Sequence, residues 1–343
     1  MAATEPTRAH LPGDASTLVL TRDFIAARVP SSAYVAAVEC AFGQLADGRI
    51  HVPQVGHAPG FDGAFHVKAA TQLDPPRRVA IKLNANFPAN PSRHGLPTIQ
   101  GVIVLFDADN GRVLALMDSV EVTAQRTAAA SVVAARLLAR PRAQRLALIG
   151  CGTQARYHFA ALLDAFPIRS VACHDIRTDA ADRLAAHALA LGLEAHVASS
   201  VQAAAEGADI VVTCTASQTP ILQRDDVGPG CFVAAVGADS PSKHEIAAEL
   251  LRRACVVPDV LAQALVMGDL HHAIDAGMMR AEDVHGELAE LVAGRVAPRT
   301  HDEQIFVFDS TGTAIADLAA ANVIFDIAQP DPDAPRFQLA DRK

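Results

Sequence analysis

One segment, residues 145–155, constrains the fold of this chain more than any other. It reads Arg-Leu-Ala-Leu-Ile-Gly-Cys-Gly-Thr-Gln-Ala, an apolar run that ends in a Gly-x-Gly-x-x-Ala turn and continues into a helical pattern. In such a turn Gly150 permits the tight bend, Gly152 lets the backbone approach a pyrophosphate, and Ala155 lets the helix pack close to the strand. The pyrophosphate lies at the helix N-terminus. The segment therefore predicts a dinucleotide-binding strand, turn and helix.

An acidic residue supports this interpretation. A second strand is expected at residues 170–174, and Asp175 follows it, 20 residues after Ala155. A carboxylate there can accept both ribose hydroxyls of NAD. Arg177, two residues further on, can pair with the 2′-phosphate of NADP and partly offset this preference. The sequence therefore predicts NAD as the cofactor, with NADP possible. An ordinary glycine-rich turn in a strand-helix unit does not account for the acid.

The length and charge of the chain limit its partners. With 343 residues, 50% of them hydrophobic, it is long enough for two globular domains with large cores. Its net charge is -9, and Lys and Arg form no cluster beyond short pairs. These features argue against a nucleic acid or an acidic membrane as the partner and favour a small molecule.

Metal sites, disulfides and targeting segments are not expected. The six cysteines form no Cys-x-x-Cys pair, so neither zinc spacing nor a disulfide framework is present. The pair His271-His272 lacks a ligand partner four residues further on. Residues 1–16 lack the pattern of a signal peptide, and no stretch approaches the roughly 18 apolar residues of a membrane helix. We therefore expect a cytoplasmic protein with reduced thiols.

Strand and helix patterns alternate from residue 145 onward, which is typical of a doubly wound parallel sheet. Several expected strands are continuous apolar runs, as in sheets that helices cover on both faces. The strands are expected at residues 145–149, 170–174, 195–198, 210–215, 232–236, 254–258 and 305–308. The predicted fold class is therefore α/β, with a Rossmann-type parallel sheet domain.

The first 118 residues follow a different pattern. A helix is expected at residues 31–45, followed by extended segments that Gly and Pro interrupt. Residues 101–106 and 113–117 form a hairpin pattern with Asn110-Gly111 at the turn, which implies antiparallel sheet and a separate, smaller α+β domain. An Ala-rich helix at about 122–139 leads into the nucleotide-binding domain. A final helix at about 314–327 is expected to return to the first domain.

Arg126 stands out by its surroundings. It is the only charge between Glu121 and Arg136, in a helix otherwise built of small and apolar residues. Such an arginine needs a carboxylate, and Glu121 is five residues away and therefore off its face of the helix. The spacing leaves open whether the carboxylate belongs to the protein or to a ligand.

Asp239 follows the strand expected at residues 232–236. It therefore lies outside the carboxyl end of a parallel strand, where open α/β sheets bind ligands. Ser242 and Glu245 form a capping-box pattern for a following helix, so Asp239 is not needed as a cap. A carboxylate that faces the nicotinamide can serve as a general acid or base.

Two lysines have ambiguous patterns. Lys82 lies in the alternating strand Val-Ala-Ile-Lys-Leu-Asn, and this pattern alone favours a solvent-facing lysine. Lys68, in Phe-His-Val-Lys-Ala-Ala, has the same ambiguity.

Six motifs in order resemble the ornithine cyclodeaminase/mu-crystallin family, over about residues 82–327. They are Lys82 with Phe87-Pro88-Ala89-Asn90-Pro91, Gly95-Leu96-Pro97-Thr98, Thr123-Ala124-Gln125-Arg126-Thr127-Ala128-Ala129, Gly150-Cys151-Gly152-Thr153-Gln154-Ala155, Gly237-Ala238-Asp239-Ser240-Pro241 with Lys243, and Phe308-Asp309-Ser310-Thr311-Gly312.

The resemblance implies a homodimer. Residues 1–118 with 314–343 would bind substrate and form the dimer interface, and residues 119–313 would bind NAD(P). It implies that Lys82 and Arg126 clamp the carboxylate of an amino-acid or imino-acid substrate, while Asp239 exchanges protons with the reacting nitrogen. The implied cofactor residues are Thr98, Gly150, Gly152, Thr153, Gln154, Ala155, Asp175, Arg177, Thr215, Val236, Gly237, Lys243 and Ser310, with Thr311 near the substrate.

The implied chemistry is NAD-dependent oxidation or reduction at the C–N bond of an α-amino or α-imino acid. In a cyclodeaminase a hydride leaves Cα, the distal amine attacks the resulting imine, ammonia departs, and the ring imine is reduced. Relatives carry out only one half of this series of reaction steps, as alanine dehydrogenases or ketimine reductases. A non-catalytic NAD(P)H-binding protein of the mu-crystallin type is the alternative from another class, and Asp239 argues against it.

Two departures from the pattern of ornithine cyclodeaminases concern the substrate. Residues 51–57 contain no arginine, where cyclodeaminases have one that contacts the carboxylate, and Lys68 stands where the bacterial enzyme has a glutamate. A lysine that faces the pocket would repel the side-chain ammonium of ornithine and favour an anionic or otherwise different substrate. Lys68 is therefore predicted to be a substrate-binding residue.

Overall fold

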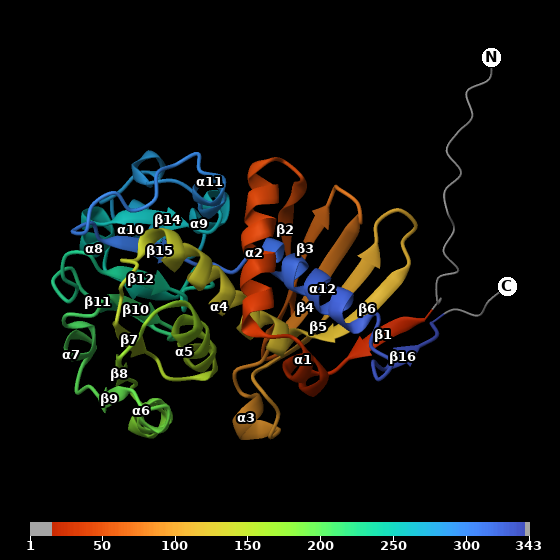
Figure 1. Cartoon of the computed structure of the whole chain (residues 1–343), viewed down its shortest axis with the longest axis horizontal. Helices are drawn as coiled ribbons and strands as arrows, with labels where there is room; N and C mark the ends of the chain where they lie inside the picture. Colours follow the sequence, from red (N-terminus) through yellow and green to blue (C-terminus); the bar gives the residue numbers. More distant parts are fainter. Residues whose placement is uncertain (1–15, 340–343) are drawn as a thin grey trace, which may run out of the picture.

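The computed structural model describes residues 16–339, except for the side chains of residues 52–55. Two seven-stranded sheets lie side by side, each with its own set of helices (Figure 1). The expectations for residues 1–15 and 340–343 lie outside the described residues. Within residues 16–339, no helix has both the length and the apolar character that crossing a membrane requires.

The first sheet has the strand order β16-β1-β6-β5-β4-β3-β2. Strands β2 to β6 pair in antiparallel fashion, and the predicted hairpin is confirmed as β5 and β6. The long strands β2, β3 and β4 fall in the region for which the sequence indicates only extended segments. The strands are Thr17–Leu20 (β1), Ile50–Pro59 (β2), Ala64–Gln72 (β3), Arg78–Asn86 (β4), Ile99–Asp107 (β5), Val113–Asp118 (β6) and Arg336–Phe337 (β16).

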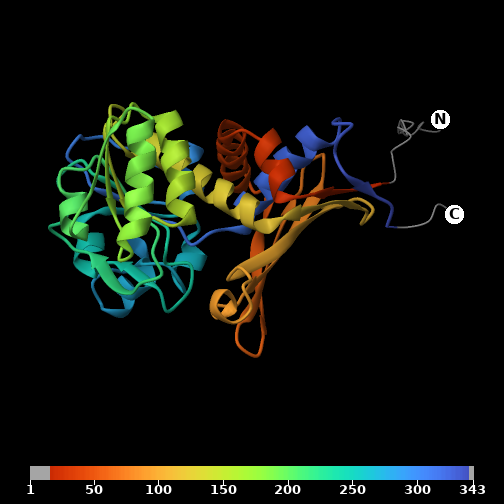
Figure 2. The same ribbon diagram turned by 90° about the horizontal axis from the view of Figure 1, so that it is seen from below.

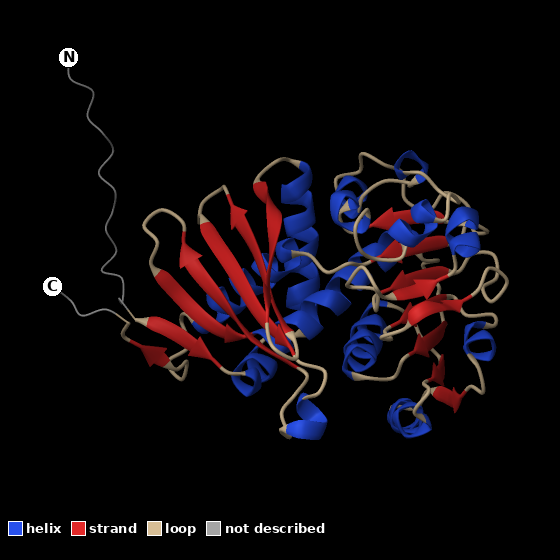
Figure 3. Ribbon diagram, turned by 180° about the vertical axis from the view of Figure 1, so that it is seen from behind, coloured by secondary structure: helices blue, strands red, loops and turns tan. Residues whose placement is uncertain are grey.

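Helices cover one face of this sheet and leave the other open. The long helices α2 (Ser31–Ala46), α4 (Ser119–Leu138) and α12 (Ala314–Ala328) pack on the covered face, and two short helices, α1 (Arg22–Arg28) and α3 (Asn90–Arg93), lie nearby. Figure 3 shows the open face in front of the helices. Because side chains alternate along a strand, Lys82 points under the helices and is buried, while Leu83 is exposed. The solvent-facing interpretation of Lys82 is therefore wrong.

The second sheet is parallel throughout, with the strand order β14-β15-β12-β10-β7-β8-β9. This confirms the predicted Rossmann-type sheet, and each predicted strand is present to within two residues at either end. The strands are Arg145–Ile149 (β7), Ser170–His174 (β8), Glu194–Val197 (β9), Ile210–Thr213 (β10), Phe232–Ala235 (β12), Cys255–Pro258 (β14) and Phe306–Asp309 (β15).

The remaining elements surround the parallel sheet. A small two-stranded sheet of β11 (Gln218–Leu222) and β13 (His244–Ile246) was not expected from the sequence. The helices are α5 (Thr153–Ala165), α6 (Thr178–Ala190), α7 (Val201–Ala205), α8 (Ala248–Arg253), α9 (Leu261–Ala264), α10 (Leu270–Asp275) and α11 (Leu288–Val292), with a 3-10 turn, η1 (Ala281–Asp283).

Two helices connect the halves of the molecule. Helix α4 runs from the first sheet to the second (Figure 2), and α12 returns from β15 to the first sheet. Helix α4 begins earlier than predicted, because the Asp118 carboxylate accepts a hydrogen bond from the Glu121 amide (2.8 Å) and caps the helix. The domain boundaries at residues 118/119 and 313/314 stay a prediction.

Candidate active site

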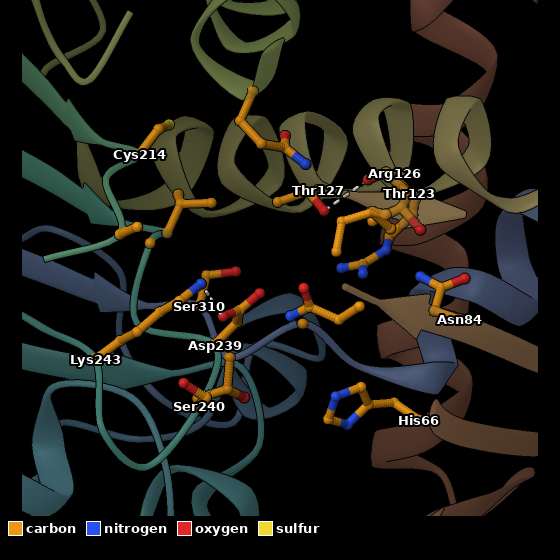
Figure 4. A pocket seen from close by; sticks show the side chains of 18 of the residues that line it. His66, Asn84, Thr123, Arg126, Thr127, Cys214, Asp239, Ser240, Lys243 and Ser310 are labelled. Atoms are coloured by element: carbon orange, nitrogen blue, oxygen red, sulfur yellow. Dashed lines mark hydrogen bonds and ion pairs between the residues drawn. The ribbon is translucent and has the colours of Figure 1, made fainter. Parts of the chain in front are cut away.

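A cavity of about 400 Å³ lies between the two sheets (Figure 4). Strands β3 and β4 and helix α4 form one wall, and the loops after β10, β12 and β15 form the other. The second wall therefore consists of the carboxyl ends of adjacent parallel strands, as in other open α/β sheets. The predicted site residues on the cavity are Lys68, Lys82, Arg126, Gln154, Thr215, Val236, Gly237, Asp239, Lys243, Ser310 and Thr311.

The glycine turn after β7 has the geometry that its sequence predicts. Gly150 has φ +84°, and a Cβ there would lie 2.8 Å from the carbonyl oxygen of Cys214. Gly152 precedes α5 without a side-chain cap, and a Cβ on it would meet nothing within 4 Å. Ala155 is fully buried between helix and strand. The N-terminus of α5, which begins at Thr153, is therefore open to an anionic group.

Asp175 is attached to this turn. Its carboxylate accepts hydrogen bonds from the Cys151 amide (2.7 Å) and from the Arg177 amide (2.8 Å). These bonds fix the acidic side chain beside the glycine turn, at the end of β8. Arg177 itself is exposed. The arrangement fits the ribose end of a dinucleotide.

One further observation fits a bound dinucleotide. The side-chain oxygen of Gln154 is buried and has no hydrogen-bond partner among the described residues, and Gln154 lines the cavity. A buried polar atom without a partner is costly, so a ligand that reaches this point would satisfy it.

Thr98 lies outside the cavity lining, although its neighbour Ile99 belongs to it. The described residues contain no group of His, Cys, Asp or Glu arranged for a metal ion.

A buried acid on α12, Asp317, holds two of the predicted cations together. The ammonium of Lys82 lies 2.6 Å from one carboxylate oxygen of Asp317, and Nε of Arg126 donates to the other (2.9 Å). All three side chains are at most 6% exposed. Because Asp317 binds Nε of Arg126, the two terminal nitrogens of Arg126 are left at the cavity. They lie close to Gly312, since a Cβ added to that glycine would be 3.1 Å from one of them.

The charges of this cluster depend on one another. Burial lowers the pKa of Lys82 to about 7, although Asp317 opposes this shift. Burial would raise the pKa of Asp317, but Lys82 and Arg126 outweigh it and leave the pKa below its usual range. Burial, followed by the charge of Arg126, lowers the pKa of Lys68. A bound carboxylate would stabilise the protonated form of both lysines.

Lys68 and Asp239 approach the cavity from opposite walls. Lys68 is the direct cross-strand neighbour of Lys82, and its ammonium donates to the carbonyl of Gly312 (2.5 Å). Asp239 lies on the loop after β12, where its carboxylate is 59% exposed and pairs with Lys243 at 2.6 Å. An exposed carboxylate at the cavity is accessible to a reacting group.

Two buried acids support the loops of the second wall. Glu245 accepts hydrogen bonds from the backbone amides of Thr215 and Gly237 (2.6 and 2.7 Å) and from the hydroxyls of Thr213 and Thr215 (2.7 Å each). The predicted capping box of Ser242 and Glu245 is therefore wrong, because Glu245 lies on β13 and those four donors satisfy its carboxylate. Asp259 accepts in the same way from the Thr311 hydroxyl (2.6 Å) and the Gly312 amide (2.8 Å).

Sequence reasoning missed several residues of the cavity. Asp317 has a signal that resembles that of Arg126, since it is a single charge among small and apolar residues in residues 314–321. No comparable signal marks the polar residues that the sheet and α4 bring to the cavity, which are His66, Asn84, Asn86, Thr123 and Thr127.

The chain is similar to known proteins over nearly its whole length. A family model described as the ornithine cyclodeaminase/mu-crystallin family matches residues 15–331. Alanine dehydrogenase of Archaeoglobus fulgidus is 35% identical over 314 residues, which cover 91% of this chain and 95% of that protein. An archaeal alanine dehydrogenase dimer with bound NAD superimposes with a TM-score of 0.90 at 33% identity, covering 95% of this chain and all of that one.

A second solved structure agrees. The iminosuccinate reductase of Paracoccus denitrificans in complex with NAD+ superimposes with a TM-score of 0.87 at 30% identity, covering 94% of this chain and 99% of that one. Family model, sequence relatives and solved structures thus agree with the motifs and with the two-sheet fold. The chain belongs to the ornithine cyclodeaminase/mu-crystallin family.

Proposed function

We propose that this protein is an NAD-dependent oxidoreductase that acts on the C–N bond of an α-amino or α-imino acid. The observation that carries the proposal is the cavity that Lys82, Arg126 and Asp239 line together, beside the glycine turn of the parallel sheet. The NAD complexes of the relatives support the choice of cofactor. Bound in this cleft, NAD would accept or supply the hydride at the substrate Cα.

The proposed clamp holds the substrate carboxylate. The terminal nitrogens of Arg126 form a planar pair that matches the two oxygens of a carboxylate, and the ammonium of Lys82 adds a point charge beside it. Asp317 on α12 contacts both side chains and fixes their orientation. Fixing the carboxylate at two points fixes Cα relative to the opposite wall, which is the positioning that a hydride step needs.

Asp239 handles the proton of the reacting nitrogen in this proposal. Its carboxylate is the only one among the described residues that line the cavity. Lys243 forms an ion pair with it, and in the proposed reaction the carboxylate accepts a proton from the amine. In the reverse direction the same carboxyl group returns that proton to the imine nitrogen.

The class of reaction within this proposal can be tested directly. Incubation with ornithine, lysine, 2,4-diaminobutyrate and alanine plus NAD, and with cyclic imino acids plus NADH, separates the variants when ammonia and absorbance are both followed. Cyclodeamination releases ammonia without a net change in NADH. Dehydrogenation releases ammonia and forms NADH. Imine reduction consumes NADH without changing the amount of ammonia. A mu-crystallin-like binding protein would bind the cofactor and turn over none of these compounds.

Asp175 is expected to set the preference for NAD over NADP. Replacing it with serine removes the carboxylate that would accept the ribose hydroxyls and repel a 2′-phosphate. We expect the ratio of kcat/KM for NADPH to that for NADH to rise by about tenfold or more, consistent with one charged hydrogen bond. Arg177→Ala is the matched control and should lower the use of NADPH alone. An unchanged ratio in the Asp175→Ser protein would contradict this assignment.

We also expect a homodimer, with residues 1–118 and 314–343 forming the interface. The open face of the first sheet exposes apolar side chains, among them the directly paired Leu83 and Val102, each 42% exposed. Helices leave this face uncovered (Figure 3), and a second copy would bury it.

Charged residues on that face should prevent dimerisation. Changing both Leu83 and Val102 to lysine would bury unpaired charge, so the dimer dissociation constant should rise by about a hundredfold or more. Light scattering coupled to size exclusion measures the mass. Leu96→Lys changes a leucine of similar exposure (48%) in the loop before β5 and should leave the dimer intact. A dimer of normal affinity in the double variant would exclude this face as the interface.

A further inference from the structure

The first wall of the cavity carries more positive charge than one substrate carboxylate neutralises. Lys68, Lys82 and Arg126 are three cations, and Asp317 is the one acid that contacts them among the described residues. On the opposite wall Asp239 and Lys243 neutralise each other. Lys68 forms no direct ion pair among the described residues, and Asp317, Asp239 and Asp259 act on its charge only from a distance. When an α-carboxylate occupies the clamp of Lys82 and Arg126, Lys68 can still bind a second anion.

Strand register shows where that excess charge lies. Lys68 on β3 is directly opposite Lys82 on β4, and the next pair on the same face is His66 opposite Asn84. Neighbouring pairs on one face are about 7 Å apart along the strand. Figure 4 shows His66 and Asn84 at the side of the cavity away from the Lys243 loop. Lys68 and His66 therefore lie on the same face of β3 along the cavity, with Lys68 directly beside Lys82 of the clamp.

Several hydrogen-bond donors lie on this part of the cavity wall, beside one acceptor, the buried amide oxygen of Asn84, which has no partner among the described residues. The ammonium of Lys68 donates to the carbonyl of Gly312 and retains two further N–H groups. The pKa of His66 is lowered by burial and then by the charges of His57 and Lys68, so the ring is neutral and can donate one N–H. The hydroxyl of Thr123 is buried and has no hydrogen-bond partner in the described part of the chain. An apolar side chain would leave these donors unsatisfied, and an ammonium would be repelled by Lys68.

We infer that the substrate carries a second carboxylate on its side chain, so that it is a 2-amino or 2-imino dicarboxylic acid whose distal carboxylate binds Lys68 and His66. The inference rests on the proposed function for the α-carboxylate clamp and for Asp239. In the reductive direction, the C=N bond of the 2-imino dicarboxylate takes a hydride at Cα from NADH and a proton at nitrogen from Asp239. The products are the 2-amino dicarboxylate and NAD+. One proton from solvent then restores the protonated form of Asp239.

Substitution of Lys68 tests the inference. The initial rates are measured with NADH, ammonium and a 2-oxo acid, either dicarboxylic (oxaloacetate, 2-oxoglutarate) or monocarboxylic (pyruvate, 2-oxobutyrate), for the wild type, Lys68→Met and Lys68→Arg. We expect kcat/KM of the wild type to favour a dicarboxylic acid by about ten- to a hundredfold, which is the range for one charged hydrogen bond. Lys68→Met should abolish this preference, and Lys68→Arg should keep most of it.

The outcome for the monocarboxylic acids decides what Lys68 binds. If Lys68→Met lowers the rate equally for both classes, Lys68 holds the α-carboxylate and the inference is overturned. It is also overturned if the wild type prefers pyruvate or 2-oxobutyrate to both dicarboxylic acids. Thermal unfolding of each variant shows whether a loss of rate reflects a loss of fold.

A binding measurement separates this inference from the proposed function. Calorimetry compares succinate with propionate on the protein without nucleotide, for the wild type and Lys68→Met. A preference for succinate that disappears in Lys68→Met supports the second carboxylate site even if no 2-oxo acid is turned over, in which case the proposed reaction alone fails. Equal affinity for the two acids in the wild type overturns the site whatever the rates are.

Discussion

Replacement of Asp239 by asparagine is expected to lower kcat by a factor of about 10² to 10⁴, the usual contribution of a general acid or base. Asparagine keeps the shape of the side chain but cannot exchange a proton with the substrate nitrogen. The side chain is exposed and, within residues 16–339, pairs only with Lys243, so the fold should not depend on it. NADH fluorescence titration should therefore give nearly the same dissociation constant as for the wild type, while steady-state turnover collapses.

A neighbouring substitution provides the control for Asp239. Ser240→Ala changes the next residue on the same loop, which also lines the cavity, and should retain most of the turnover. If Asp239→Asn is as active as Ser240→Ala with every accepted substrate, the proton-transfer role of Asp239 is excluded.

Replacement of Asp317 by asparagine is expected to have the largest effect on both stability and substrate binding. The variant leaves Lys82 and Arg126 buried without their counter-ion, and breaking a buried ion pair in this way costs about 3 to 5 kcal/mol of the free energy of unfolding. The guanidinium of Arg126 also loses its fixed orientation, so kcat/KM should fall by about a hundredfold. Denaturant unfolding and steady-state kinetics measure the two effects. The control is Asp326→Asn. Asp326 lies on the same helix as Asp317, and its exposed carboxylate pairs with Arg78 of β4, so its loss should cost less than about 1 kcal/mol of the free energy of unfolding.

The pH profile distinguishes an electrostatic role of Asp317 from a purely structural one. Lys82 binds a carboxylate in its protonated form, so kcat/KM of the wild type should fall as the pH rises through the Lys82 pKa of about 7. Asp317 is the main group that raises this pKa, and burial and Arg126 lower it. Removing Asp317 should therefore move the alkaline limb to lower pH, and Asp317→Glu should restore it. An alkaline limb at the same pH in all three proteins would contradict this.

The parallel sheet is the part of the fold that the sequence predicts best. Its strands are continuous apolar runs followed by short turns, and β7 and β8 occupy the predicted residues. The small sheet of β11 and β13 was missed because its residues are mixed in polarity and β13 has only three residues. Ser242 and Glu245 matched a capping box by spacing alone, and only the tertiary structure shows that Glu245 bonds to the ends of β10 and β12 instead.

The candidate site could be predicted in part. The roles assigned to Lys82, Arg126 and Asp239 stay predictions, but the structure brings all three to one cavity. The alternation around Lys82 could not show which face of β4 is covered, because the helix that covers it comes from residues 314–328 at the other end of the chain. Long-range packing of this kind leaves no periodic trace in the local sequence.

The position of Asp317 on α12 has a consequence for synthesis of the chain on the ribosome. Lys82 and Arg126 are translated long before residues 314–328, and the whole parallel sheet is made in between. Until α12 emerges, the nascent first sheet lacks both a large part of its apolar covering and the anion that its buried cations need. Contacts of such long sequence separation slow folding, because the entropy of loop closure is lost before they form. We therefore expect the cavity to be among the last parts of the molecule to assemble, and a chain that stops before α12 lacks Asp317.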